Sequence, residues 1–185
     1  MVILGSKSPR RKEILEMLGV EFKVFTPDVL EDVSVYRSPS EYVKKTALKK
    51  GLATSKIFPN DTVICADTIV TLDKEILEKP KDKNDAKKMI TMLNGRYHHV
   101  LTAVYIKKNN ANYDLFVTKT KVYISKMSED EIEEYINTAE PYDKAGGYAI
   151  QGIFAKFIEK IDGDYYNVMG LPLNEVYKKL KKNWW

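Results

Sequence analysis

Short apolar runs separated by polar turns divide this chain into strand-like and helix-like segments. The run at 62–72 is apolar or β-branched almost throughout, which is typical of a buried strand in the centre of a sheet. Two longer runs, at 99–106 and 113–125, are joined by a polar turn and predict two more strands. Shorter strands are predicted at 2–4, at 20–24, at 75–77 and just before the Asp162-Gly163 turn signal.

Capping residues mark where the helices begin. Ser8 followed by Pro9 is a typical helix start, and Gly19 ends that helix. The segments 38–41 and 128–131 both have the Ser-x-x-Glu spacing of a capping box. Helices are therefore predicted at 9–18, from 39 onward, at 84–93, from 129 onward and from 172 onward.

Helices and strands alternate here without strict strand–helix–strand repetition, so the expected fold is α/β with a mixed sheet. No repeat, low-complexity block or linker rich in proline, serine or glycine interrupts the chain. We expect a single domain over residues 1–185, a length sufficient to bury a sizeable core.

The composition excludes several classes of protein. Cys65 is the only cysteine, so a disulfide framework and thiolate-rich zinc sites are excluded, and we expect it to be a buried small hydrophobe. His98 and His99 are the only histidines and face opposite sides of a strand, so they cannot share a metal. No apolar run approaches the roughly 20 residues of a membrane helix. The N-terminal segment carries its charge after the apolar stretch, the reverse of a signal peptide, so a cytoplasmic protein is expected.

The charge balance says little about partners. Thirty Lys and Arg residues against 26 Asp and Glu residues leave a net charge of +4. The densest basic cluster, at 178–182, is expected to be the solvated face of a helix. No stripe of basic residues with interleaved aromatic residues appears, so we expect no nucleic-acid partner.

Two segments carry candidate binding chemistry near the start of the chain. Gly5 to Arg11 links a strand to a helix, whose N-terminus favours phosphate. Ser6, Arg10 and Arg11 add hydroxyl and guanidinium donors, although a capped surface helix is an equally good interpretation. The acidic loop at 28–32 offers Asp28, Glu31 and Asp32 as oxygen ligands for Mg²⁺ or Mn²⁺, although such loops are usually only solvated.

Asp67 is the sharper candidate because it interrupts an otherwise apolar strand. A buried carboxylate is costly unless a cation, a metal or several donors lie beside it, so a functional role is favoured. Lys79 precedes Pro80 and is held extended, as either a surface lysine or a phosphate ligand. The glycine-rich stretch 142–152 can approach a ligand closely, and Gln151 within it could read the edge of a base. Together these groups suit chemistry on a polyphosphate.

Five motifs make the sequence resemble a known family. They occur in the order and spacing found in the Maf (septum-formation-inhibitor-like) nucleotide pyrophosphatases, over about residues 3–180. In this chain they read SKSPRRKEILEMLG, ADTIV, LEKP, DKAGGYAIQG and GDYYNVMGLPL.

The resemblance implies a mixed, elongated sheet flanked by helices, with two lobes around a cleft as in the related ITPase-like proteins, usually in a homodimer. It also implies a metal-dependent pyrophosphatase that converts a nucleoside triphosphate to the monophosphate and pyrophosphate. The functional positions of the family fall on Ser6, Arg10, Arg11, Glu31, Lys50, Asp67, Lys79 and Gln151. Lys50 rests on a less distinctive motif, so the neighbouring Lys49 is an alternative.

The branch of the family can also be inferred by resemblance. The dTTP/UTP branch has Arg, Thr and Gln at three marker positions, where this chain has Arg10, Thr68 and Gln151. The branch similar to 7-methyl-GTP pyrophosphatases tends instead to have Trp, Gln and Glu. The expected substrates are thus dTTP, UTP or modified pyrimidine nucleotides, with Thr68 and Gln151 selecting the base.

The chain departs from the family pattern at two places. The family usually has Ala where Gly5 stands, an exchange expected to have little consequence. Its acidic loop reads Asp-x-Asp-Glu, whereas this chain has Asp28-Val29-Leu30-Glu31, so the choice between Glu31 and Asp32 stays open.

The expected mechanism is in-line attack of water on the α-phosphorus. A divalent cation, Mg²⁺ or Mn²⁺, would be held by Asp67 and Glu31, with Asp67 also acting as general base or orienting the water. Ser6, Arg10, Arg11, Lys50 and Lys79 would neutralise the triphosphate. An alternative is a nucleotide-binding regulator of cell division with little turnover.

Overall fold

The computed structural model describes residues 1–29, 36–108 and 112–181. Its strands form one seven-stranded sheet in the order β2-β1-β3-β5-β6-β7, with β4 paired to β3. The strands are β1 (Val2–Gly5), β2 (Phe22–Phe25), β3 (Thr62–Leu72), β4 (Glu75–Leu77), β5 (Tyr97–Lys107), β6 (Tyr113–Ile124) and β7 (Ile158–Asp162). β1 runs parallel to β2 and β3, whereas β4 and β7 pair antiparallel to β3 and β6, so the predicted mixed sheet is confirmed.

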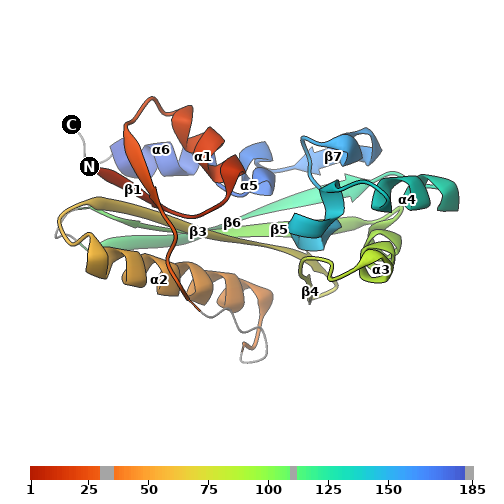
Figure 1. The fold of residues 1–185 in the computed structure, drawn as a ribbon, viewed down its shortest axis with the longest axis horizontal. Coiled ribbons are helices and arrows are strands. Elements are labelled where there is room, and N and C mark those ends of the chain that lie inside the picture. The colour runs from red at the N-terminus through yellow and green to blue at the C-terminus, as the bar shows by residue number, and fades with distance from the viewer. Residues whose placement is uncertain (30–35, 109–111, 182–185) are drawn as a thin grey trace. The chain divides into compact units, whose positions relative to one another are not determined.

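Helices flank this sheet, and their starts agree closely with the capping signals. They are α1 (Pro9–Glu16), α2 (Pro39–Ile57), α3 (Lys83–Leu93), α4 (Glu129–Ile136), α5 (Tyr165–Met169) and α6 (Leu173–Lys181), with 3₁₀ turns η1 (Glu140–Asp143), η2 (Ala145–Gly147) and η3 (Ile153–Phe157). In Figure 1, α2 covers one face of β1 and β3, and α1 and α6 cover the other. The capping box of α4 is complete, since Ser128 and Glu131 each accept from the other's backbone N–H.

Three details of the element predictions are wrong. α1 ends at Glu16, so Leu18 lies in the turn that closes at Gly19, whose φ is +66°. The strand predicted at 20–24 is β2, which begins two residues later, at Phe22. The short helix α5 follows the Asp162-Gly163 turn and was not predicted.

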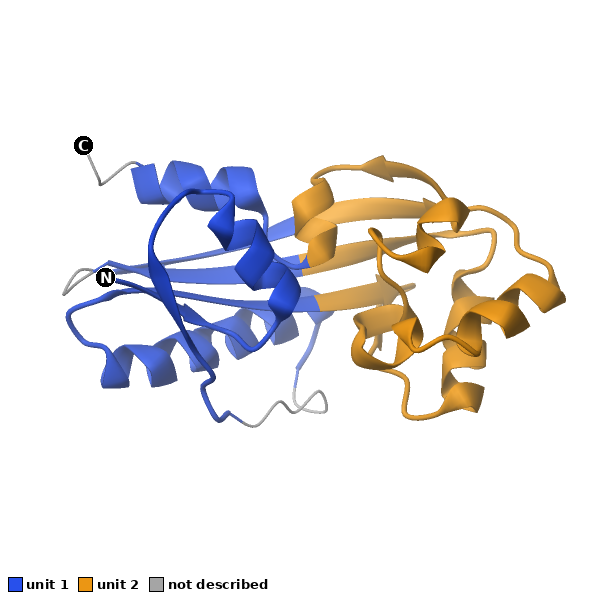
Figure 2. Cartoon of the chain, turned by 45° about the horizontal axis from the view of Figure 1, so that its top comes forward, with its two compact units in different colours: residues 1–68, 102–118, 170–185 blue, residues 69–101, 119–169 orange. Residues whose placement is uncertain are grey.

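The chain forms two compact units and passes from one to the other four times. Unit 1 comprises residues 1–68, 102–118 and 170–185, and unit 2 comprises residues 69–101 and 119–169 (Figure 2). Strands β3, β5 and β6 therefore contribute residues to both units.

Each unit has its own core. In unit 1, Ile3, Val63, Cys65 and Tyr105 form a buried cluster against which Leu48 of α2 packs. In unit 2, a larger cluster joins Val70 of β3 to α3, α4 and Phe154 of η3. The helices that the structure describes do not include one with the length and apolar composition needed to span a bilayer.

Candidate functional site

The turn between β1 and α1 is organised by Ser6. The backbone N–H of Ser8 donates to the Ser6 hydroxyl at 3.2 Å, and the Ser6 N–H donates to Leu4 O at 3.0 Å. Ser8 takes the N-cap position of α1 without a side-chain capping bond. This turn follows the carboxyl end of a parallel strand, the place where α/β sheets commonly bind ligands.

Arg11 connects this turn to β3 and to the start of the C-terminal segment. Its Nη1 donates to the Ser6 hydroxyl at 3.1 Å, and its Nη2 donates to the Thr68 hydroxyl at 2.9 Å. Its Nε donates to the carbonyl of Gly170 at 2.8 Å. Three predicted site residues, Ser6, Arg11 and Thr68, thus form one hydrogen-bonded cluster around the guanidinium.

Asp67 is buried and paired with a lysine. The residue is 7% exposed, and its Oδ1 lies 2.8 Å from Nζ of Lys50 on α2. Lys49 is exposed and lies with its Nζ 5.9 Å from the Tyr36 ring. Of the two lysines left open by the sequence, Lys50 is the one that contacts the strand carboxylate.

Asp67 and Thr68 face opposite sides of the sheet. Successive side chains of a strand alternate between faces, and here Asp67 meets α2 whereas Thr68 meets Arg11 of α1. The register between β1 and β3 ends at Leu4 and Ile64, so both residues lie beyond the paired stretch. At this place the backbone edge of β3 is no longer occupied by β1, and both polar clusters of unit 1 adjoin it.

The other predicted residues are placed separately. Arg10 is half-buried in the first turn of α1. Lys79 and Gln151 are exposed residues of unit 2. Lys79 precedes the buried Pro80, and Gln151 follows the buried Ile150. Glu31 and its alternative Asp32 lie outside the described residues.

The donor set allows a limited test of a divalent cation. Among the residues that the structure describes, no group of three or more His, Cys, Asp or Glu side chains is arranged to hold a metal ion. Asp67 is one carboxylate, and Mg²⁺ is commonly held by one or two carboxylates together with substrate phosphates. Among the described site residues, Asp67 is therefore the carboxylate to which a cation arriving with the phosphates would bind.

The prediction that Cys65 is a buried small side chain is confirmed. Cys65 is fully buried, and burial raises the pKa of its thiol to about 11, so it is not a nucleophile at neutral pH. His98 is buried and His99 is half-buried, and burial lowers the pKa of His98 to about 3. A neutral, enclosed imidazole is a structural group at physiological pH.

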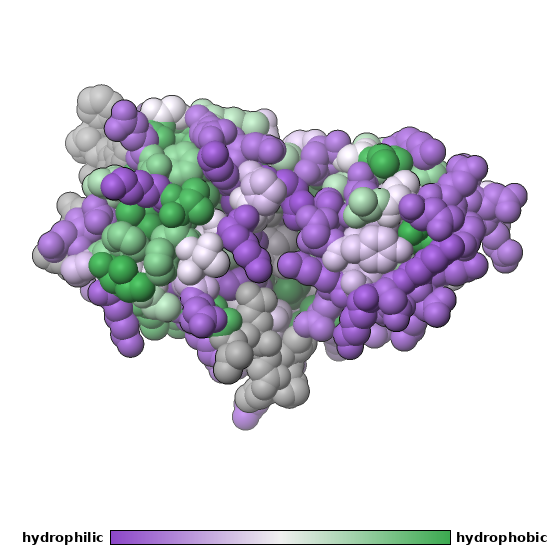
Figure 3. All heavy atoms as spheres, viewed as in Figure 1, coloured by the Kyte–Doolittle hydropathy of each residue, from purple (hydrophilic) through white to green (hydrophobic). Residues whose placement is uncertain are grey.

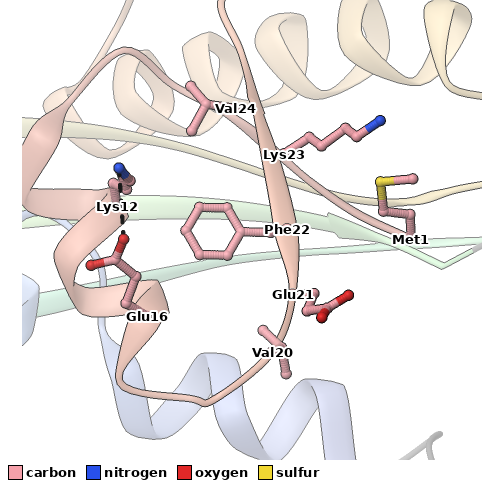
Figure 4. A pocket seen from close by; sticks show the side chains of 8 residues that line it. All are labelled: Met1, Lys12, Glu16, Val20, Glu21, Phe22, Lys23 and Val24. Atoms are coloured by element: carbon pink, nitrogen blue, oxygen red, sulfur yellow. Dashed lines mark ion pairs between the residues drawn. The ribbon is translucent and has the colours of Figure 1, made fainter.

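A surface depression in unit 1 lies apart from these residues. It is lined by Lys12 and Glu16 of α1 and by residues 20–24 around β2 (Figure 4). Lys12 and Glu16 form an ion pair, with 3.7 Å between Nζ and Oε1. Figure 3 shows hydrophobic surface around β2, where Val24 is exposed. None of the residues that line this depression was predicted as a site residue.

Two participants could not be named from the sequence. Thr102 of β5 lies with its hydroxyl 2.9 Å from that of Thr68, and the Gly170 carbonyl accepts from Arg11. Gly170 has a φ of +116°, a backbone conformation suited to glycine. The motif around Gly170 was a signal for the segment, but nothing indicated that its carbonyl would be the acceptor.

The fold and these contacts define the class: an α/β protein with charged, hydrogen-bonded groups that link the end of β1 to the middle of β3. The family model described as Maf-like protein matches residues 1–183. The chain therefore belongs to the Maf-like protein family.

Similar proteins with names span the whole chain. A dTTP/UTP pyrophosphatase of Geobacillus sp. is 44% identical over 184 residues, covering 100% of this chain and 98% of the relative. Another, from Acholeplasma laidlawii, is 46% identical over 182 residues, covering 98% of this chain and 95% of the relative.

Solved structures support the fold. The Staphylococcus aureus Ham1 protein matches with a TM-score of 0.55 at 13% identity, covering 98% of both chains. A HAM1 protein from Coxiella burnetii gives the same values. At this identity the likeness shows the arrangement of the sheet and helices and nothing about the substrate.

Proposed function

We propose that this protein hydrolyses dTTP and UTP to the nucleoside monophosphate and pyrophosphate. The observation that carries the proposal is the buried Asp67–Lys50 pair, in a chain whose full-length relatives are named dTTP/UTP pyrophosphatase. A buried ion pair is often no more stabilising than apolar side chains of the same size. Its presence in the central strand is therefore better explained by chemistry than by stability.

The chemistry assigned to Asp67 is that of a general base. Water attacks the α-phosphorus, the bond from this phosphorus to the bridging oxygen breaks, and pyrophosphate leaves. Asp67 orients that water and takes its proton, while the ammonium of Lys50, 2.8 Å away, holds the carboxylate in place before substrate binds.

Cationic and hydroxyl groups bind the phosphates in this proposal. Arg10, Arg11 and Lys79 neutralise the triphosphate and the charge that develops on the leaving pyrophosphate. Ser6, already an acceptor for Arg11 and for the Ser8 N–H, has its own hydroxyl proton to donate to a phosphate oxygen. Thr68 and Gln151 select the pyrimidine.

Asp67 and the substrate phosphates would hold Mg²⁺ or Mn²⁺, with Glu31 as a second carboxylate. When bound, the ion supplies positive charge to the phosphate oxygens. The remaining parts of the proposal are a homodimer and a cytoplasmic location, which light scattering of the purified protein and cell fractionation test directly.

Replacing Asp67 by Asn tests the role of the carboxylate. Asp67→Asn keeps the side-chain shape but removes the base, so we expect pyrophosphate release to fall by roughly 10²- to 10⁴-fold. Binding of dTTP, measured by calorimetry, should remain. The matched control is Asp114→Asn, which removes a surface partner of Lys179 in the same unit, 3.3 Å from its Nζ. Turnover of Asp67→Asn at the control's rate would remove Asp67 from the mechanism.

A further inference from the structure

A group of side chains in unit 2 holds the loop that carries Gln151. We call Tyr135, Glu140, Tyr148 and His98 the anchor network, because each makes a hydrogen bond to the loop or from within it. None of the four was assigned a role from the sequence. All four lie in the same unit as Gln151.

Glu140 fixes the chain immediately after Gln151. Its Oε2 accepts from the Ile153 N–H at 2.6 Å, and its Oε1 accepts from the Phe154 N–H at 3.1 Å. These two N–H groups begin the 3₁₀ turn η3, so the carboxylate acts as its cap. Gly152 leaves the space for this approach, since a Cβ there would overlap the carboxylate of Glu140.

Tyr135 joins this cap to the beginning of the loop. Its hydroxyl lies 3.0 Å from Glu140 Oε1 and 3.0 Å from the carbonyl oxygen of Gly147, and its single proton is shared between these two acceptors. Burial raises the pKa of Tyr135, as does the nearby Glu140 carboxylate, so the hydroxyl keeps its proton. One phenol thus links Gly147, inside the glycine-rich stretch 142–152, to the cap that follows this stretch.

His98 and Tyr148 form the third attachment. His98 Nε2 on β5 lies 2.6 Å from the Tyr148 hydroxyl, with the ring centroids 5.3 Å apart. Burial lowers the pKa of His98 and raises that of Tyr148, so this bond joins two neutral groups. His98 Nδ1 has no hydrogen-bond partner among the described residues. A buried polar atom without a partner costs free energy that an apolar side chain at this position would avoid. The hydrogen bond to Tyr148 is therefore the feature that explains a histidine here.

The same loop also supports Lys79. The Gly146 N–H donates to the Glu78 carbonyl at 3.0 Å, and a Cβ on Gly147 would lie 3.2 Å from Cγ of Pro80. Both glycines have positive φ, at 71° and 74°. The loop therefore packs directly against the residues on either side of Lys79.

These attachments leave Gln151 as the exposed end of a fixed loop. Tyr148, Ala149 and Ile150 are each at most 7% exposed, whereas Gln151 is exposed. When the backbone is held at both sides of a residue, binding through its side chain costs little backbone conformational entropy. The backbone before and after Gln151 is set by groups that need not touch the ligand.

We propose that the anchor network positions Gln151, and with it the Lys79 segment, for recognition of the pyrimidine nucleotide. Tyr148 and Glu140 are positioning residues, and they act through the loop backbone. This inference rests on the proposed function, because Gln151 is taken to read the base.

A double-mutant cycle between Tyr148 and Gln151 tests the proposal. Tyr148→Phe removes one hydroxyl and keeps the ring, and Gln151→Ala removes the presented amide. We expect Tyr148→Phe to raise the KM for UTP and dTTP by about tenfold and to leave kcat within about twofold. In the Gln151→Ala background the same change should alter KM by less than about twofold, because the group being positioned is gone. Glu140→Gln carries the same expectation independently.

Tyr105→Phe is the matched control, since its hydroxyl lies 3.1 Å from that of Ser55 in unit 1, outside both the network and the loop. It should leave KM unchanged, whatever its effect on the melting temperature. A KM effect of equal size with and without Gln151, a parallel loss of kcat, or no KM effect in either variant would each overturn the proposal. The same cycle is measured as Kd for an α,β-imido analogue of UTP. If wild type hydrolyses no nucleotide, the proposed function fails, and the Kd cycle still decides whether the network positions Gln151.

Discussion

At the scale of single residues, two neighbours on β3 divide the polar chemistry of unit 1 between the faces of the sheet. Asp67 faces α2 and pairs with Lys50, whereas Thr68 faces α1 and accepts from Arg11. A ligand that uses both residues must reach the strand where β1 no longer borders it, beyond Ile64.

The sequence was sufficient to single out Asp67, because a carboxylate within an apolar strand is costly without a partner. It could not decide between Lys49 and Lys50, since both lie on the same helix and only the register of α2 against β3 separates them. Thr102 and Gly170 were missed for a related reason. Their contacts with Thr68 and Arg11 depend on pairing of distant segments, which local patterns do not report.

His98 leads to a prediction about pH and stability. Burial lowers its folded pKa from 6.5 to about 3, so below pH 6.5 the unfolded chain binds a proton that the folded chain does not. The contribution of His98 to the free energy of unfolding should therefore be complete above pH 6.5 and should decrease as the pH falls below this value. Between pH 7.5 and 5.5 the loss from this residue is about 1 kcal/mol.

Urea unfolding of wild type and His98→Gln at the two pH values measures this loss. The pKa of His99 is also lowered, but His99 is present in both proteins and its contribution cancels. The variant should show the smaller decrease in unfolding free energy. Equal decreases in the two proteins would mean that His98 is not buried as the neutral imidazole.

At the scale of elements, capping residues predicted the helix starts well because a cap satisfies backbone groups locally. Ser38 and Ser128 each accept an N–H three residues on. The alternation at 20–24 predicted strand β2, whose four residues are half-buried or exposed. Short elements such as α5 carry too few residues for a periodic signal.

The packing of β1 against β3 and α2 corrects the expectation for Gly5. A Cβ on Gly5 would overlap the sulfur of Cys65 and lie 2.8 Å from Oγ1 of Thr54. The space that an alanine methyl would take is therefore filled by the Cys65 side chain. Gly5→Ala should destabilise the protein by about 1–3 kcal/mol, as overpacking of a core does.

Combining Gly5→Ala with Cys65→Ala provides the check. Removing the sulfur makes room for the new methyl, so the double variant should be more stable than the sum of the single changes by about 1 kcal/mol. Chemical denaturation of the three variants measures this coupling. Additive effects would show that Cys65 does not occupy the space in question.

At the scale of the whole molecule, the sequence predicted the mixed sheet but not how the chain is distributed over two compact units. The boundary cuts β3 after Thr68 and β5 after Leu101, inside continuous strands where composition does not change. Such a boundary leaves no linker to recognise. The motifs were more informative than the elements, because their order reflects the family to which the chain belongs.

The central claim is that this chain cleaves pyrimidine nucleoside triphosphates between the α- and β-phosphates. The most direct measurement incubates purified protein and Mg²⁺ or Mn²⁺ with dTTP, UTP, CTP, ATP and GTP, and separates the products by ion exchange. The account predicts monophosphate and pyrophosphate from dTTP and UTP, with kcat/KM about tenfold or more above that for the purine nucleotides. Absence of pyrophosphate from every nucleotide, or a preference for purines, would contradict it.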